Sequence, residues 1–291
     1  MKVGIDSYCY HRFFGEVYPE QVPPPKKMTL EDFIRRAKQL EVDGVSLESC
    51  FIDRFDKAYL SEVKGMLDEL NLDRVFAWGH PDGLEGGKNE KMFEDMMKSI
   101  EYAADIGAPV MRVVGSSLAF RFEPHGPQLE KLSEWFSIAA KEVERKGIKM
   151  AIENHLDFNS EEMLQLFRNV NSPNVGINFD TGNFVRVLDD PVKAMQKLAK
   201  LTFATHIKDL KIQKGAAVDD WYFFSCTPVG DGGIVDNQKI GQLLEDNGYE
   251  GFMAVEIDFL HPDYKNDEDK AVAQSIKELK RIARAVEKNK K

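Results

Sequence analysis

Four residues that could bind a metal or transfer a proton each stand at the end of a short apolar run. Glu153 closes "MAIE", Asp180 closes "VGINFD", His206 follows "LTFAT" and Glu256 follows "FMAV". One polar strand end is common, but this repetition indicates that the four ends meet at one place. Three carboxylates facing a common point repel one another unless a cation lies between them. We therefore predict that these four residues bind a divalent metal ion.

The ligand set also indicates which metal and which chemistry to expect. Carboxylate oxygens with one imidazole nitrogen favour Mn²⁺, with Co²⁺ or Mg²⁺ as alternatives, over a metal that prefers thiolates. A divalent ion holding the carbonyl and adjacent hydroxyl of a keto-sugar acidifies the C–H between them, because it stabilises the enediolate. Glu153 and Glu256 are the candidate catalytic pair that removes and returns the proton. Taken alone, each acid also fits a rim ion pair or a helix cap, as Asp180 before Thr181 does.

Other polar residues near the same strand ends are candidates for substrate binding. His155 and Lys208 each follow a predicted ligand by two residues, so they point the same way along their strands. Lys208 fits either a partner for a substrate oxygen or a surface lysine, and His155 fits a substrate donor, a support for a ligand or a core histidine. Glu48 and His80 end two further strands, and we expect them to line the opposite wall.

Two long segments follow predicted strands and are rich in aromatic residues. They are "YCYHRFFGEVYPEQVPPPKK" from Tyr8 and "KIQKGAAVDDWYFFSCTPVGDGG" from Lys211. Long loops in compact domains are usually lids or binding loops, so we predict that residues such as Trp221 contact the substrate. The alternative is that these rings pack on the barrel or on a partner subunit.

The rest of the chain must position these residues, and it alternates short β-rich runs with helical segments. Apolar residues recur at three- and four-residue spacing in "TLEDFIRRAKQL" and "QLEKLSEWFSIAAKEVERKG", while Gly107 and Gly147 stand where helices should end. The predicted strands cover residues 3–5, 44–47, 74–77, 110–114, 149–152, 175–179, 203–205 and 253–255. No linker divides them, which predicts one α/β domain over 1–291, a closed (β/α)8 TIM barrel. The carboxyl ends of all strands then converge on one face.

Composition and missing motifs exclude several functions. The formal net charge of −10 argues against nucleic acid, which needs a basic face. No G-x-G-x-x-G follows the first strand, which disfavours an open dinucleotide-binding sheet. The start "MKVGIDSY" lacks a signal-peptide pattern, and no apolar run could span a bilayer. The three cysteines follow no metal-finger spacing, so we predict reduced thiols in a cytoplasmic protein.

Taken together, the strand-end motifs resemble the xylose isomerase-like TIM barrel superfamily, which includes sugar epimerases, inosose dehydratase, hydroxypyruvate isomerase and endonuclease IV. The motifs are "ENH", "FDTGN", "HIKD", "VGDGGIVD" and "VEID", spread over nearly the whole chain. The resemblance implies that Glu153, Asp180, His206 and Glu256 bind one divalent metal and that the two glutamates transfer protons. It thus implies an isomerase or epimerase of a keto-sugar or related polyol.

The resemblance leaves a second activity open. Ketose 3-epimerases of the family usually carry His and Arg where this chain has Asn183 and Ile212, although Asn183 stays a candidate substrate contact. The alternative is a lyase or dehydratase, similar to inosose dehydratase or to members that cleave 3-keto-C-glycosides with a small second subunit. Only six histidines are present, which disfavours a three-metal DNA-repair enzyme. We expect a carbohydrate substrate, a homo-oligomer, and no nucleic-acid or membrane partner.

Overall fold

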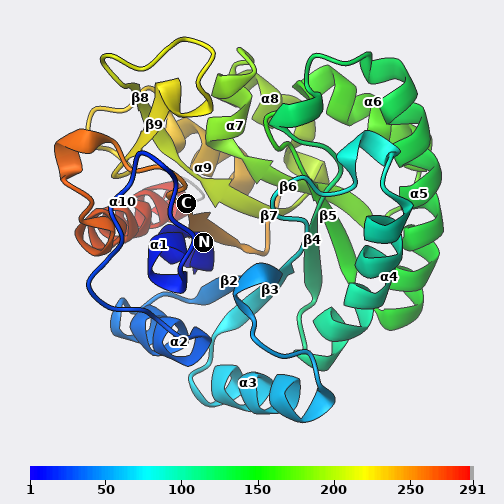
Figure 1. Ribbon diagram of the computed structural model, residues 1–291, viewed down its shortest axis with the longest axis horizontal. Coiled ribbons are helices and arrows are strands. Elements are labelled where there is room, and N and C mark those ends of the chain that lie inside the picture. The colour runs from blue at the N-terminus through cyan, green and yellow to red at the C-terminus, as the bar shows by residue number, and fades with distance from the viewer. Residues whose placement is uncertain (289–291) are drawn as a thin grey trace.

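The computed structural model describes residues 1–288, which form a closed barrel of eight parallel strands surrounded by helices (Figure 1). Going round the barrel, the strand order is β1, β10, β7, β6, β5, β4, β3 and β2. The strands are β1 (Lys2–Asp6), β2 (Gly44–Glu48), β3 (Asp73–Ala77), β4 (Val110–Val114), β5 (Lys149–Glu153), β6 (Val175–Asp180), β7 (Thr202–Ile207) and β10 (Phe252–Val255). Each of the eight predicted strands lies within one of these, and the predicted TIM barrel is confirmed.

The helices begin and end where short polar residues and glycines indicate. Thr29 and Asn159 each form a reciprocal capping box at the start of a helix, and Gly147 ends α5 in the left-handed conformation at φ 68°. Gly107, at φ 71°, directly follows Ile106, the C-cap residue of α4. The helices are α1 (His11–Phe14), α2 (Leu30–Gln39), α3 (Lys57–Glu69), α4 (Glu90–Asp105), α5 (His125–Lys146), α6 (Ser160–Val170), α7 (Thr181–Arg186), α8 (Pro191–Leu198), α9 (Asn237–Asp246) and α10 (Glu268–Lys288).

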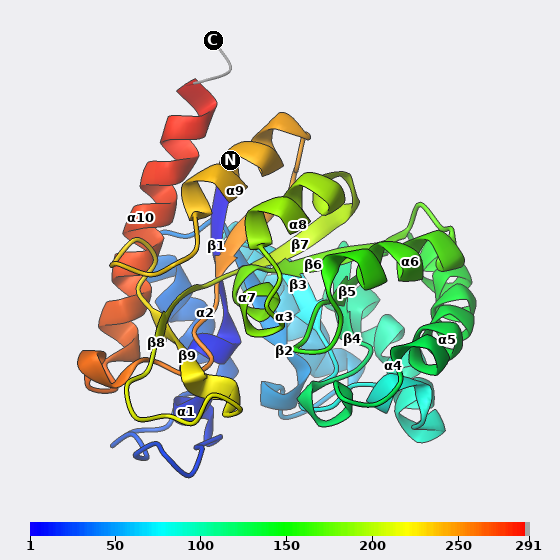
Figure 2. The same cartoon turned by 90° about the horizontal axis from the view of Figure 1, so that it is seen from above.

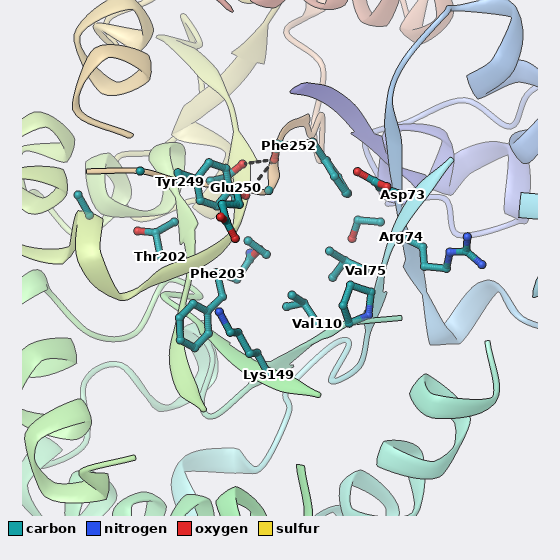
Figure 3. Close-up of a pocket in the computed structure, with 18 of the residues that line it drawn as sticks. Asp73, Arg74, Val75, Val110, Lys149, Thr202, Phe203, Tyr249, Glu250 and Phe252 are labelled. Atoms are coloured by element: carbon teal, nitrogen blue, oxygen red, sulfur yellow. Dashed lines mark hydrogen bonds between the residues drawn. The ribbon is translucent and has the colours of Figure 1, made fainter. Parts of the chain in front are cut away.

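The interior of the barrel near its amino end contains small side chains and the large ring of Phe252. A Cβ atom on Gly4 or Gly44 would lie 2.2 Å or 2.5 Å from the ring of Phe252, so glycine is required where this ring crosses the lumen. Around it lies a cavity of about 470 Å³, which Val75 and Phe203 help to line, whereas the side chain of Arg74 points outward (Figure 3). This cavity is at the end of the barrel opposite the predicted metal ligands.

The two long aromatic segments predicted as loops contain regular structure. The first folds into a 3-10 helix (Ser7–Tyr10) and α1, because the side chain of Asp6 accepts a hydrogen bond from the backbone N–H of Tyr8 and caps the turn. The second contains an antiparallel pair, β8 (Asp209–Ile212) and β9 (Phe224–Thr227). Figure 2 shows both segments at the same end of the barrel, where the rings of Tyr18 and Trp221 lie 5.1 Å apart.

Two further predictions concern the thiols and the membrane. Cys9, Cys50 and Cys226 are all free, in agreement with the prediction of reduced thiols. No helix within residues 1–288 combines the length and apolar character needed to cross a membrane.

Candidate metal and substrate site

The structure brings the four predicted metal ligands together at the carboxyl ends of neighbouring strands. Glu153, Asp180 and His206 belong to β5, β6 and β7, and Glu256 directly follows β10. All four are buried, and one ligand atom from each lies within 4.8 Å of the others. His206 Nδ1 is 3.1 Å from Glu256 Oε2, 3.5 Å from Glu153 Oε1 and 3.8 Å from Asp180 Oδ2.

This cluster has the properties of a cation site. Asp180 Oδ2, Glu256 Oε2 and both ring nitrogens of His206 are buried and make no hydrogen bond of regular geometry. Leaving buried polar atoms unpaired costs free energy, and buried carboxylates in particular require a nearby positive charge. Three oxygen donors and one imidazole nitrogen therefore fit a divalent metal ion.

Asp180 uses its two oxygens for different purposes. Oδ1 accepts hydrogen bonds of 2.8 Å from the backbone N–H groups of Gly182 and Asn183 and so caps α7, while Oδ2 faces the cluster. Asn154 exchanges two hydrogen bonds of 2.9 Å with the backbone of Asp180, which ties β5 to β6. The helix cap and the metal ligand, which the sequence presented as alternatives, are therefore compatible in one side chain.

Glu153 is held by Arg112, a buried residue of β4 that the sequence analysis did not select. The Arg112 Nε–H donates to Glu153 Oε2, and its Nη1 lies 3.3 Å from a carboxylate oxygen of Glu48. Asn178 donates to the same oxygen of Glu153 over 3.3 Å. Burial alone would raise the pKa of Glu153, but the charge of Arg112 outweighs it and holds this pKa well below its usual value. For Glu48, burial dominates and raises the pKa to about 7.

Lys208 is buried in the cluster, so the surface-lysine alternative is wrong. Its Nζ lies 2.8 Å from Asp180 Oδ2, 2.8 Å from Glu256 Oε2 and 2.7 Å from Asp258 Oδ2. Burial opposes ionisation of Glu256, but the charges of His206 and Lys208 lower its pKa to about 2. A Cβ on residue 182 would lie 2.9 Å from Lys208 Cδ, which explains the glycine of "FDTGN". Lys208 thus supplies part of the positive charge that the carboxylates require.

Behind the cluster, Asp6 orients the imidazole of His206. Asp6 Oδ2 lies 3.2 Å from His206 Nε2, on the far side of the ring from the other ligands. Such a carboxylate fixes which ring nitrogen carries the proton and where the other nitrogen points. Asp6, Glu48 and Glu256 also form a second group of carboxylates close enough to share a cation.

A cavity of about 330 Å³ opens from the cluster to the carboxyl face of the barrel. All six residues predicted to bind the substrate line it: Glu48, His80, His155, Asn183, Lys208 and Trp221. On one wall, His80 Nε2 lies 2.7 Å from Glu16 Oε1, which also accepts a 2.7 Å hydrogen bond from the hydroxyl of Tyr8. Burial lowers the pKa of His155 to about 4, so its ring is neutral at neutral pH.

Several residues of the site were missed by the sequence analysis, although some carried a signal. Asp6 ends "KVGID" with the same pattern that identified the other ligands, and Arg112 interrupts the apolar run "VMRVV". Asp258 follows the predicted ligand Glu256 by two residues, the spacing that identified His155 and Lys208, whereas Arg186, with which it forms a buried bidentate ion pair beside Lys208, carries no such pattern. Their pairing depends on where α7 and the segment after β10 lie in the fold.

Comparison with known proteins agrees with the barrel fold. Inosose dehydratase of Clostridium beijerinckii is 24% identical over 218 residues, which cover 67% of this chain and 72% of that protein. The structure of a D-tagatose 3-epimerase-like protein is 17% identical, with a TM-score of 0.75 and 100% of both chains covered. That of the IolI protein with a bound zinc atom is 14% identical, with a TM-score of 0.72 and 98% and 99% covered. The xylose isomerase-like TIM barrel model matches residues 34–288, and the chain belongs to this family.

Proposed function

We propose that this protein is a divalent-metal-dependent isomerase or epimerase of a keto-sugar or related polyol. The observation that carries the proposal is the buried cluster in which two glutamates, Glu153 and Glu256, lie beside one imidazole and one aspartate. A pair of carboxylates allows one to remove a proton from the substrate and the other to return it. Homology to inosose dehydratase supports an enzyme of carbohydrate conversion.

The metal would be held by Glu153, Asp180, His206 and Glu256, and we favour Mn²⁺, with Co²⁺ or Mg²⁺ as alternatives. When bound, such an ion polarises carbonyl and hydroxyl oxygens and so acidifies the C–H bond beside them. The zinc in the IolI structure belongs to that protein and does not identify the metal here.

The residues around the cluster have distinct tasks in this proposal. Arg112 fixes the Glu153 carboxylate through its Nε–H, and Lys208 does the same for Glu256 from 2.8 Å. Lys208 and the neutral His155 line the cavity, and the ring N–H of His155 can donate a hydrogen bond to a substrate hydroxyl. Trp221 lines the same cavity and offers an apolar ring against which a substrate can pack.

A dehydratase is the second candidate, and a specific pair of residues favours it. The ion pair of His80 and Glu16 lies in the wall of the same cavity, apart from the metal cluster. Burial opposes protonation of His80, but its hydrogen bond with Glu16 raises the pKa of the imidazole, so this ring can deliver a proton to a departing hydroxyl. Asn183 and Ile212, which differ from the ketose 3-epimerase pattern, also agree with this reading.

The test is a screen of ketoses, inososes and keto-glycosides with Mn²⁺ in deuterated water. An isomerase or epimerase incorporates solvent deuterium into the substrate carbon without loss of mass, whereas a dehydratase releases water and a glycoside lyase releases the aglycone. The proposal would be contradicted if none of the screened compounds exchanged deuterium and if protein purified without chelator contained no metal. A homo-oligomeric state, a small second subunit and a cytoplasmic location stay predictions.

A further inference from the structure

The reaction cavity carries more negative charge than its own cations balance. Five carboxylates line it. Four of them have a cationic side chain within 4.0 Å: Glu16 beside His80, Glu48 beside Arg112, Glu256 beside Lys208, and Asp258 beside Lys208 and Arg186. The fifth is Asp82, and no cationic group of residues 1–288 lies within 4.0 Å of its carboxylate.

Asp82 is held in place by one oxygen and leaves the other open. It belongs to the loop between β3 and α4 and is half-buried. Its Oδ1 accepts a 2.6 Å hydrogen bond from the hydroxyl of Ser117, which fixes the carboxylate against the segment that follows β4. Its Oδ2 makes no hydrogen bond within residues 1–288 and is not sealed from solvent. The carboxylate is therefore positioned in the wall of the cavity with an oxygen that can bind a ligand.

A bound metal ion does not remove this shortage of positive charge. The cavity and the metal cluster together hold eight carboxylates: Asp6, Glu16, Glu48, Asp82, Glu153, Asp180, Glu256 and Asp258. The balancing charges are two on a divalent metal and one on each of four side chains: His80, Arg112, Arg186 and Lys208. Two negative charges remain, and a proton shared within the cluster still leaves one. Because charges interact more strongly in a partly buried cavity than in water, the site favours a positively charged group on the substrate.

The same cations leave no group for an anionic substrate. Arg112 contacts both Glu48 and Glu153, and His80 pairs with Glu16. Lys208 Nζ lies within 2.8 Å of three carboxylates. Phosphate and carboxylate groups are typically bound by arginine or lysine side chains that are available to them. We therefore expect phosphorylated and carboxylated sugars to bind poorly in this cavity.

We propose that the substrate carries an amino group, so that it is an amino-substituted keto-sugar or polyol, and that its ammonium binds the carboxylate of Asp82. This inference rests on the proposed function, because the carbonyl and adjacent hydroxyl of the same molecule face the metal cluster. The ammonium donates to Asp82 Oδ2, while the hydroxyl of Ser117 holds Oδ1. The charge of the cavity then selects the substrate, since it attracts the amine and repels anionic sugars.

Binding of a set of sugars to the Mn²⁺-loaded protein tests the amine site separately from the chemistry. The probes are D-glucose, D-glucuronate and the 2-amino, 3-amino and 6-amino derivatives of D-glucose. They are measured by calorimetry at about pH 6.5, where such amines are protonated. Loading with Mn²⁺ keeps the ammonium out of the metal cluster. We expect at least one amine to bind about tenfold more tightly than D-glucose, and D-glucuronate to bind more weakly than D-glucose.

The inference is wrong if no amine binds more tightly than D-glucose, or if D-glucuronate binds as tightly as the best amine. Either result overturns it even where deuterium exchange supports the proposed function. Conversely, an amine preference without deuterium exchange in any screened compound would leave the amine site standing and contradict the proposed function.

Two matched variants locate the effect. Asp82→Asn keeps an oxygen that can accept from Ser117 but removes the negative charge, so the preference for the amine should disappear while thermal stability is unchanged. Asp219→Asn removes a negative charge from the wall of a different cavity at the same end of the barrel, and it should retain the preference.

The same pair examines the simpler role for Asp82, which is to tie two loops together through Ser117. A preference for the amine that survives Asp82→Asn would leave only that role and overturn the inference. Equal losses in Asp82→Asn and Asp219→Asn would overturn it as well, because they would show that the amine responds to the overall charge of this end of the barrel and not to one carboxylate.

Discussion

The two ends of the barrel bear charged residues in very different surroundings. At the amino end, Lys2 pairs with Asp73 over 2.5 Å while both side chains are about half exposed. At the carboxyl end, Lys208 and Arg112 pair with acids that are almost fully buried. Exposed pairs contribute little, whereas buried charges persist only where the fold supplies partners. The difference indicates that the carboxyl end is organised around its charges and that the amino end is not.

Removing one arginine from each end gives the largest expected contrast. Arg112→Met leaves Glu153 and Glu48 buried without their main partner, so we expect a loss of about 3 to 5 kcal/mol in the free energy of unfolding. Arg74→Met at the amino end removes a pair with the half-exposed Asp68 and hydrogen bonds to the backbone carbonyls of Ile106 and Leu72, and should cost about 2 kcal/mol or less. Urea unfolding of the metal-free variants measures both values. Equal losses would show that the buried cluster does not depend on Arg112.

The next prediction separates the tasks of the four clustered residues. Glu153→Gln and Glu256→Gln retain an oxygen that can bind metal but cannot accept a proton, so turnover should fall roughly a hundredfold or more even at saturating Mn²⁺. Asp180→Asn and His206→Gln should instead lose mainly metal affinity. The measurement is turnover of the substrate found in the screen, over a series of Mn²⁺ concentrations.

Removing the metal with chelator should abolish the activity of the unmodified protein, and Mn²⁺ should restore it. If excess Mn²⁺ also restores most of the activity of the two glutamine variants, Glu153 and Glu256 act as ligands only. The proton-transfer part of the proposed function would then be wrong.

The barrel could be predicted from the sequence because its strands are short apolar runs that end in polar residues. The convergence of Glu153, Asp180 and His206 follows from this pattern once the barrel is closed. Arg186 could not be found in the same way, because its partner Asp258 lies 72 residues further along the chain. The second cavity at the carboxyl end of the barrel, lined by residues such as Phe122, Leu188 and Trp221, is likewise formed by segments that are distant in sequence and that carry no shared motif.

Asp157 extends the comparison to the dependence of stability on pH. Burial raises its pKa to about 7, compared with about 3.9 in an unfolded chain. Between these values the folded state binds more protons than the unfolded state, so the contribution of Asp157 to stability falls as pH rises from about 4 to about 7. Asp157→Asn does not titrate, so its stability relative to the unmodified protein should increase by about 1 to 4 kcal/mol across this range.

Thermal unfolding at several pH values between about 4 and 8 measures this change. Asp73→Asn, at the exposed amino end, serves as the control and should show no comparable increase. A difference between Asp157→Asn and the unmodified protein that stays constant with pH would mean that the Asp157 carboxyl titrates normally.

The smallest effect is expected for the pair at the amino end. Lys2 and Asp73 are 53% and 49% exposed, so water screens their attraction and both side chains lose freedom on pairing. Lys2→Gln should therefore lower the free energy of unfolding by less than about 1 kcal/mol, and the difference should shrink further in about 1 M salt. Urea titrations of both proteins at low and high salt provide the measurement. A larger loss that salt does not reduce would show that the amino end, too, depends on its charges, and the contrast between the two ends would no longer hold.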